Sequence, residues 1–171
     1  MRKQITFYLI VLSILVSACA TPYKSSGYRG GYYETWISER EAKVVFNGNG
    51  YTTSKRAANY AAFRACELTL ENGYSHFIVI DDEANVTSST AQISPDRTDI
   101  NPNGYGGVTA TTRPGQTVTF FKPSNHLHIF FISEDEIELA QENGLRPISA
   151  KFFLERNAPE SIRNKILEKN E

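Results

Sequence analysis

Residues 41–80, EAKVVFNGNGYTTSKRAANYAAFRACELTLENGYSHFIVI, determine the fold of this chain. Their first seven residues alternate between apolar and polar side chains, which predicts a β-strand over 41–47. The apolar side chains on one face of this strand are Ala42, Val44 and Phe46. Gly48-Asn49-Gly50-Tyr51 follows and predicts a turn, because glycine and asparagine tolerate a positive φ.

An α-helix is predicted over 55–72, capped at its start by Thr53 or Ser54 and ended by Gly73. On a helical wheel its polar residues form one narrow strip: Arg56, Tyr60, Arg64, Glu67 and Glu71. The other positions are mostly apolar, and such a wide apolar arc predicts a helix that is largely buried against a sheet. Cys66 lies within this arc, so we interpret it as a small core residue, with a reactive thiol as the alternative.

Further strands and short helices complete the predicted domain. The strands are 76–81, 116–121 and 127–132, and Pro123-Ser124-Asn125 separates the last two. A capping box at Ser133–Glu136 predicts a short helix that ends at Gly144. Residues 148–155 fit a strand or a short helix. Pro159 suits the first turn of a final helix that runs to about Glu168. The predicted fold class is α+β: an antiparallel sheet of about four strands, one long helix packed on a face, and short C-terminal helices.

Two segments are predicted to lack a packed structure. Residues 20–34 contain Gly, Ser and Pro without apolar periodicity, so 19–34 is expected to be a flexible tether ahead of a domain over 35–171. Fully extended, this tether would reach roughly 50 Å. Residues 84–115 are rich in Ser, Thr, Asn, Pro and Gly, which predicts a long loop that is either disordered or a mobile hairpin.

The N-terminus has the pattern of an export signal. Met1-Arg2-Lys3 precedes an apolar run over 5–16, which is shorter than the roughly 20 residues that span a bilayer as a helix. Leu15-Val16-Ser17-Ala18-Cys19 resembles the lipobox of bacterial lipoproteins. This resemblance implies a signal peptide over 1–18, cleavage before Cys19, and acylation of Cys19 by fatty acids such as palmitate. A plain secreted protein or an uncleaved anchor helix are the alternatives.

A longer stretch resembles a group of small lipoproteins of Gram-negative bacteria. The residues that carry the resemblance are VVFNGNGYTT over 44–53, Arg56-Ala57, Arg64-Ala65, ELTL over 67–70, Gly73-Tyr74 and Phe77-Ile78-Val79. The resemblance implies an envelope lipoprotein with no settled reaction. Because Ala20 rather than Asp follows Cys19, it also implies an outer-membrane location facing the periplasm. Cys66 departs from the Ala expected at its position, which argues against a catalytic thiol.

Charge and motifs exclude several classes of function. The chain has 18 Lys and Arg against 19 Asp and Glu, so it has no general basic field for nucleic acid. Removal of 1–18 leaves 16 basic residues and a net charge of about −3. The sequence has no Gly-x-Ser-x-Gly, His-Glu-x-x-His, Cys-x-x-Cys or Walker-type motif.

We therefore expect a non-enzymatic protein without a cofactor, held in the bilayer through Cys19. Its expected work is interaction with an envelope protein or with peptidoglycan. A periplasmic domain that binds a small ligand, an anion or a metal is the alternative.

The start of the predicted helix is a candidate anion site. Its residues are Asn49, Gly50, Thr52, Thr53, Ser54, Lys55 and Arg56. The first helical turn offers free backbone N–H groups, while the hydroxyls and the two cations suit a phosphate or a carboxylate. An ordinary turn and cap with two solvated cations is the alternative.

His126 and His128 are a candidate metal site. Two positions apart on a strand, they lie on one face, which is the spacing of a two-histidine site. Asp81, Asp82 and Glu83 at the end of a strand are the available carboxylates. Phe130 and Ile132 continue the same face, so the alternative is that the histidines edge a half-buried surface.

Overall fold

The computed structural model describes residues 20–92, 94–102 and 108–170. The predicted signal peptide and Cys19 lie outside these residues. The chain divides into two compact units, unit 1 with residues 1–86 and 122–171 and unit 2 with residues 87–121. Strands β3 and β6 belong in part to each unit.

Unit 1 is built on an antiparallel sheet, which confirms the predicted α+β class. The sheet has five strands in the order β1-β2-β6-β3-β7. The strands are β1 (Gly31–Ser38), β2 (Glu41–Asn47), β3 (His76–Gln92), β6 (Thr117–Ile132) and β7 (Ile148–Ser149). The edge strand β1 was not predicted. Residues 148–155, predicted as a strand or a short helix, contribute the two-residue β7 and most of a short helix.

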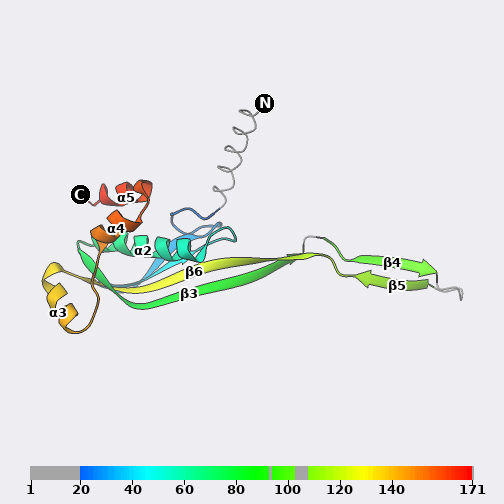
Figure 1. Ribbon diagram of the computed structural model, residues 1–171, viewed down its shortest axis with the longest axis horizontal. Helices are drawn as coiled ribbons and strands as arrows, with labels where there is room; N and C mark the ends of the chain where they lie inside the picture. Colours follow the sequence, from blue (N-terminus) through cyan, green and yellow to red (C-terminus); the bar gives the residue numbers. More distant parts are fainter. Residues whose placement is uncertain (1–19, 93, 103–107, 171) are drawn as a thin grey trace, which may run out of the picture. The chain divides into compact units, whose positions relative to one another are not determined.

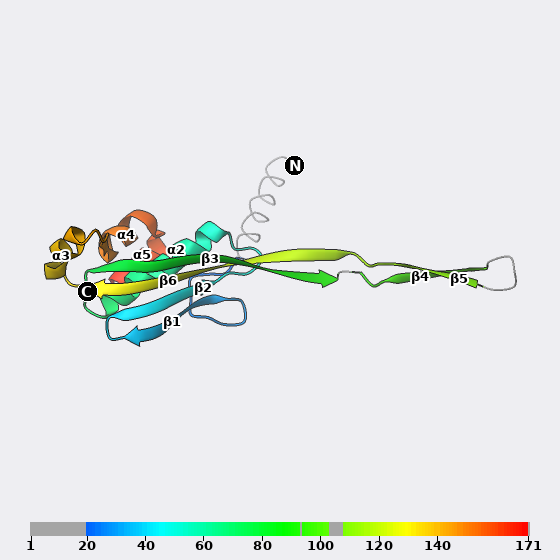
Figure 2. The same ribbon diagram turned by 90° about the horizontal axis from the view of Figure 1, so that it is seen from below.

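Three of the described helices form layers on one side of this sheet, and the fourth, α3 (Ile137–Glu142), lies at the end of the sheet (Figure 1). The three are α2 (Ser54–Glu71), α4 (Ala150–Asn157) and α5 (Glu160–Leu167), while α3 follows a 3-10 turn at Glu134–Glu136. Helix α2 lies along the sheet, and α4 and α5 lie on the side of α2 away from it (Figure 1). In the view onto the opposite face, no described helix crosses in front of β1, β2 or β6 (Figure 2).

Helix α2 begins and ends where the sequence predicts. The side chain of Thr53 accepts a hydrogen bond from the N–H of Arg56 at 3.2 Å, so Thr53 is the N-cap. At the other end Gly73 has a φ of +78°, which lets its N–H and that of Tyr74 bond back to Leu70 and Thr69. This termination is the Schellman motif that a glycine after a helix favours.

The hydrophobic core lies between the sheet and α2. Its buried residues include Val44 and Phe46 from β2, Phe77 from β3, Leu127, Ile129 and Phe131 from β6, and Ala57, Ala61, Phe63, Ala65, Cys66 and Leu68 from α2. Small alanines on α2 allow the helix to approach the strands closely. Cys66 is fully buried, and this burial raises the pKa of its thiol, in agreement with the prediction of a core residue.

The turn between β2 and α2 differs from its prediction, since neither Gly48 nor Gly50 has a positive φ. Gly48 is required for space instead, because a Cβ there would lie 2.7 Å from the Cβ of Thr52 and 3.0 Å from the carbonyl oxygen of Pro123. The Asn49 side chain accepts a hydrogen bond from the N–H of Tyr51 at 3.0 Å, which closes the turn.

Residues 20–34 are packed on unit 1, in contrast to the predicted tether. Thr21 is 1% exposed, and the Tyr23 ring contacts Tyr32 at 4.9 Å and Tyr60 at 5.6 Å between centroids. Gly31, with a φ of +129°, makes this possible, because a Cβ there would lie 2.5 Å from the carbonyl oxygen of Lys24. The glycines that suggested flexibility therefore allow the segment to fold back on itself.

Strand β6 runs continuously through Pro123, where a break between two strands was predicted. The last paired residues of β2 and β6 are Asn47 and Ser124, and the carbonyl of Pro123 accepts a hydrogen bond from Gly48. Beyond this point β2 turns away toward α2. Proline is tolerated because it lies one residue beyond the last β2–β6 pair, where one missing N–H leaves the rest of that ladder intact.

Unit 2 is a β-ribbon, whereas the sequence left open a disordered loop or a hairpin over 84–115. It contains the ends of β3 and β6 and a two-stranded sheet of β4 (Arg97–Pro102) and β5 (Val108–Arg113). Threonine pairs face each other across the strands, Thr90 with Thr119 at 3.3 Å and Thr98 with Thr112 at 3.0 Å between hydroxyl oxygens. β-branched threonines favour strands even where no apolar residue marks a core.

Candidate functional site

Two of the candidate anion residues, Thr52 and Thr53, have hydroxyls that are bound within the chain. The Thr52 hydroxyl accepts N–H groups from Thr21 at 3.1 Å and from Asn49 at 3.3 Å, and it donates to the Asn49 side chain at 3.0 Å. The Thr53 hydroxyl caps α2. The Thr21 hydroxyl accepts the N–H of Asn49 at 2.9 Å, so Thr21 is bound to two of the candidate anion residues.

Lys55 and Arg56 lie beside the turn before α2 on a surface hollow of about 240 Å³. The hollow is also lined by Thr53, Asn59, Tyr60, Phe63, Asn157 and Pro159. Gly50, Ser54, Lys55 and Arg56 are exposed. An anion site here remains a prediction that rests on these two cations, and it would be excluded if exchanging both for Gln left the protection of the fold by anions unchanged.

His126 and His128 share one face of β6, as their spacing predicts, and this is the sheet face opposite α2. They alternate with the buried Leu127 and Ile129, and together with Lys43, Asp81 and Glu83 they line a hollow of about 80 Å³. His128 Nε2 lies 2.6 Å from a carboxylate oxygen of Glu41. Within 20–92, 94–102 and 108–170, no group of three or more metal-ligating side chains surrounds one point. Metal binding remains a prediction that rests on the two histidines.

Asp82 does not join the histidines. Its carboxylate accepts a hydrogen bond at 2.9 Å from the side-chain amide of Asn125, a residue on the same face as Leu127 and Ile129. The other carboxylate candidates, Asp81 and Glu83, do line the histidine hollow. The three consecutive acids are therefore divided between the two faces of β3, as side chains alternate along a strand.

A buried ionic network on α2 is the main feature that the sequence did not reveal. Arg64 is 8% exposed, and its guanidinium contacts Glu34 at 2.9 Å, Glu67 at 2.8 Å and Glu71 at 3.4 Å. The Tyr23 hydroxyl donates to Glu67 at 2.6 Å. Burial, together with the charge of Glu67, raises the pKa of Tyr23, so the phenol stays protonated. The polar strip of the predicted helix hinted at these residues, but their partners come from distant parts of the chain.

This network joins α2 to three other parts of the chain. It links α2 to β1 through Glu34 and to the N-terminal segment through Tyr23, while Lys169 pairs with Glu71 from the C-terminus. The Arg64 guanidinium also lies over the ring of Tyr32, 4.8 Å from its centroid. Since each charged group has a partner, we interpret the network as structural.

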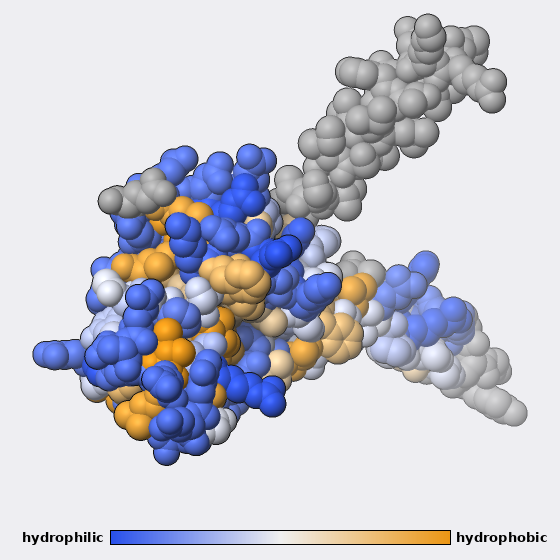
Figure 3. Space-filling view, turned by 60° about the vertical axis from the view of Figure 1, so that its left-hand side comes forward, coloured by the Kyte–Doolittle hydropathy of each residue, from blue (hydrophilic) through white to orange (hydrophobic). Residues whose placement is uncertain are grey.

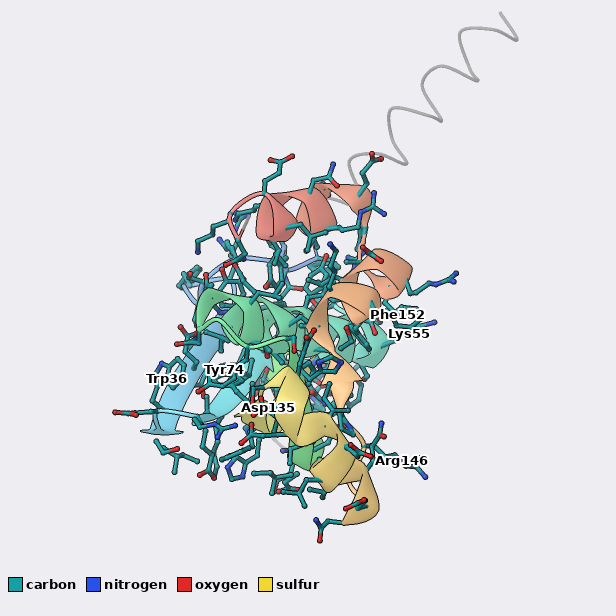
Figure 4. All side chains as sticks on the ribbon, turned by 90° about the vertical axis from the view of Figure 1, so that its left-hand side faces the viewer. Trp36, Lys55, Tyr74, Asp135, Arg146 and Phe152 are labelled. Carbon is teal, nitrogen blue, oxygen red and sulfur yellow. The ribbon has the colours of Figure 1, made fainter. Side chains whose placement is uncertain are left out.

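An aromatic cluster lies at the end of unit 1 where α2 ends. Trp36 and Tyr74 contact Phe131, with ring centroids 5.8 Å and 5.6 Å apart, and Arg40 lies over the Tyr74 ring. Trp36 and Tyr74 are labelled in the view of this end (Figure 4). On the face shown in Figure 3, the described residues form several small apolar patches that hydrophilic residues separate.

The lipidation candidate Cys19 lies outside the described residues, but its neighbours do not. Ala20 is half-buried and Thr21 is buried between the turn that precedes α2 and the carbonyl of Arg29, to which its hydroxyl donates at 2.9 Å. None of the helices within the described ranges is long and apolar enough to cross a membrane.

Comparison with known proteins identified no matching family model, no similar curated protein and no similar solved structure.

Proposed function

We propose that this protein is an outer-membrane lipoprotein of a Gram-negative bacterium, anchored through acylated Cys19 and facing the periplasm. It acts as a non-enzymatic interaction module of the cell envelope. The ribbon of unit 2 is its contact element, and an envelope protein or peptidoglycan is its partner. The anchor is supported by the lipobox-like residues 15–19.

The observation that carries the interaction role is a ribbon without a core. None of the side chains described between 87 and 121 is buried. Ile100, Phe120 and Phe121 are 64%, 39% and 60% exposed. An isolated two-stranded ribbon is marginally stable in water, and strand edges pair readily with added strands. A partner that covers a face or an edge of this ribbon would supply the burial that the ribbon lacks.

Site-specific photocrosslinking in intact cells tests the contact element. A photoreactive amino acid is placed at Ile100, at Phe120 or, as a control, at the exposed Ser161 on α5. We expect one common adduct from the two ribbon positions and none from position 161. Digestion of the adduct by a muramidase identifies peptidoglycan, and digestion by a protease identifies a protein. Equal adducts from ribbon and control positions, or none from the ribbon, would contradict the proposal.

The anchor is tested separately by metabolic labelling with a palmitate analogue. We expect the wild-type chain to be labelled and the Cys19→Ala variant to be unlabelled. Label on both chains, or on neither, would reject acylation at this residue.

A second candidate function is the binding of a small ion in the histidine hollow. The observation that favours it is the gathering of Lys43, Asp81, Glu83, His126 and His128 around about 80 Å³. Zinc titration of the chain tests it, with a His126→Ala/His128→Ala double variant as the control. Saturable heat that the double variant loses would support this function, and the absence of heat would remove it.

A further inference from the structure

The chain enters unit 1 at a defined point on its surface. Thr21 is fixed by three hydrogen bonds. Its N–H donates to the Thr52 hydroxyl at 3.1 Å, and its own hydroxyl donates to the carbonyl of Arg29 at 2.9 Å. The same Thr21 hydroxyl accepts the N–H of Asn49 at 2.9 Å. These partners belong to the turn before α2 and to the turn at Gly27–Gly30. Thr21, two residues after Cys19 in the sequence, therefore lies beside the start of α2.

Almost no spacer separates the acylated residue from the folded unit. Cys19 is two residues from Thr21, so their Cα atoms lie at most about 7 Å apart. A flexible segment over 19–34 would instead have reached roughly 50 Å. Acyl chains on Cys19 would enter the bilayer, and this part of unit 1 would be held at the level of the headgroups.

The two chain segments that meet at this point carry cations and no carboxylate. The segments 20–33 and 42–66 contain no Asp or Glu. We define the anchor-side surface by six exposed residues: Lys24, Tyr28, Arg29, Tyr51, Lys55 and Arg56. The end of unit 1 with α3 is acidic, since Glu134, Asp135, Glu138 and Glu142 are exposed there. An anionic bilayer attracts the first end and repels the second.

The anchor-side surface also carries two exposed tyrosines. Tyr28 and Tyr51 are 106% and 67% exposed, so neither contributes to the core. An aromatic ring with a polar tip is favoured at the boundary between headgroups and acyl chains. Exposed tyrosines among cations suit a lipid surface better than they suit water.

We infer that the anchor-side surface lies directly on the bilayer and contacts anionic lipid headgroups. This inference rests on the proposed anchor at Cys19. Such a contact orients unit 1, so that the start of α2 faces the lipid and the aromatic cluster around Trp36 faces away from the lipid. An 18-residue helix spans about 27 Å, which separates the two ends well beyond contact with one headgroup layer.

Fluorescence quenching in vesicles tests this orientation with the full-length lipidated protein. The sole tryptophan, Trp36, lies at the distal end, and a Trp36→Phe/Tyr51→Trp variant moves the fluorophore to the anchor-side surface. Vesicles contain phosphatidylethanolamine, phosphatidylglycerol and a lipid with a nitroxide on its headgroup. We expect strong loss of fluorescence at position 51 and none at Trp36. A similar loss of fluorescence at both positions in vesicle-bound protein would overturn the inference.

Flotation with the same vesicles tests the anchor at Cys19 independently of the orientation of unit 1. Wild-type protein that floats, with Cys19→Ala protein that does not, supports the anchor, and quenching then decides the orientation. Wild-type protein that fails to float would reject the anchor and, with it, the membrane-facing surface.

Matched charge variants test the role of anionic lipid. Lys55→Gln/Arg56→Gln removes two exposed cations from the anchor-side surface, and Arg146→Gln/Lys151→Gln removes two at the distal end, where Arg146 is labelled (Figure 4). We expect only the first pair to reduce quenching at position 51, and to do so only in vesicles with phosphatidylglycerol. Equal effects of the two pairs would overturn the basic contact.

Amine acetylation of the wild-type protein provides a readout that needs no substitution. Lys24 and Lys55 should lose reactivity when the protein is bound to vesicles, relative to detergent, while Lys151 and Lys165 should keep it. Unchanged reactivity of Lys24 and Lys55 would contradict the inference. Because this experiment uses the wild-type protein, its result does not depend on whether the variants fold.

Discussion

At the scale of single residues, Glu136 shows how one side chain can join two segments. Its carboxylate accepts hydrogen bonds from the N–H of Ser133 at 2.9 Å and the hydroxyl of Ser133 at 2.8 Å, which confirms the predicted capping box. Arg40, from the turn between β1 and β2, binds the same carboxylate at 2.9 Å. Local sequence predicts the first interaction, whereas the second depends on the fold.

Glu136 should make stability depend on pH in acid. Its hydrogen bonds from Arg40 and Ser133 lower the pKa of the carboxyl from 4.5 to about 2 in the folded protein. A lowered pKa means that the stabilisation is complete above pH about 4.5 and is lost as pH falls through about 2. Urea unfolding across this range should therefore show a difference between wild type and Glu136→Gln that shrinks toward pH 2. A constant difference would contradict this assignment.

Cys66 should be protected from reagents in the folded protein. It is fully buried, and its raised pKa keeps the thiol protonated. In a Cys19→Ala variant, where Cys66 is the sole thiol, we expect maleimide to react only as fast as the protein unfolds, and rapidly in urea. Rapid labelling of the native protein would show an accessible thiol and revive the alternative of a reactive cysteine.

At the scale of elements, helix α2 connects nearly all of unit 1. Its apolar arc meets the sheet as predicted, while Arg64 and Glu67 of the polar strip meet β1 and the N-terminal segment rather than solvent. The strip could be located from the helical period, because the period depends on local residues only. The burial of Arg64 and Glu67 could not, because residues 20–34 cover them only after folding back.

Removing the central cation of this network should destabilise the protein strongly. Arg64→Met leaves the buried Glu67 without its ion-pair partner, and we expect a loss of about 3 kcal/mol in the free energy of unfolding. Arg56→Met on the same helix is the control, since Arg56 is exposed and should change the free energy by less than about 0.5 kcal/mol. Chemical denaturation measures both, and similar losses in the two variants would contradict a structural network.

At the scale of the whole molecule, the two units differ in what holds them together. Unit 1 has a continuous core between the sheet and α2, and every residue of that core lies outside 87–121. Unit 2 has backbone ladders and paired threonines but none of the described side chains is buried. Burial of apolar surface is the main stabilising term in folding, so unit 1 should not depend on the ribbon.

Replacement of residues 87–121 by a two-residue Asn-Gly turn tests this independence. The turn suits an antiparallel pair of strands, and we expect the melting temperature to change by less than about 4 °C. Phe46→Ala in the intact chain is the positive control, because loss of a fully buried Phe should cost about 3–5 kcal/mol. A ribbon deletion as damaging as Phe46→Ala would show that the two units fold as one.

The sequence by itself determined the central strand–helix–strand unit, the cap of α2, the capping box at Ser133 and the sharing of one strand face by the two histidines. These features depend on side-chain period and on hydrogen bonds within a few residues, both of which are local. Only the tertiary structure decided that residues 20–34 are packed, that Arg64 is buried among carboxylates and that Thr21 binds the turn before α2. Each of these depends on groups about 30 or more residues apart, such as Thr21 with Thr52 and Glu34 with Arg64, because burial is a property of what the rest of the chain brings near.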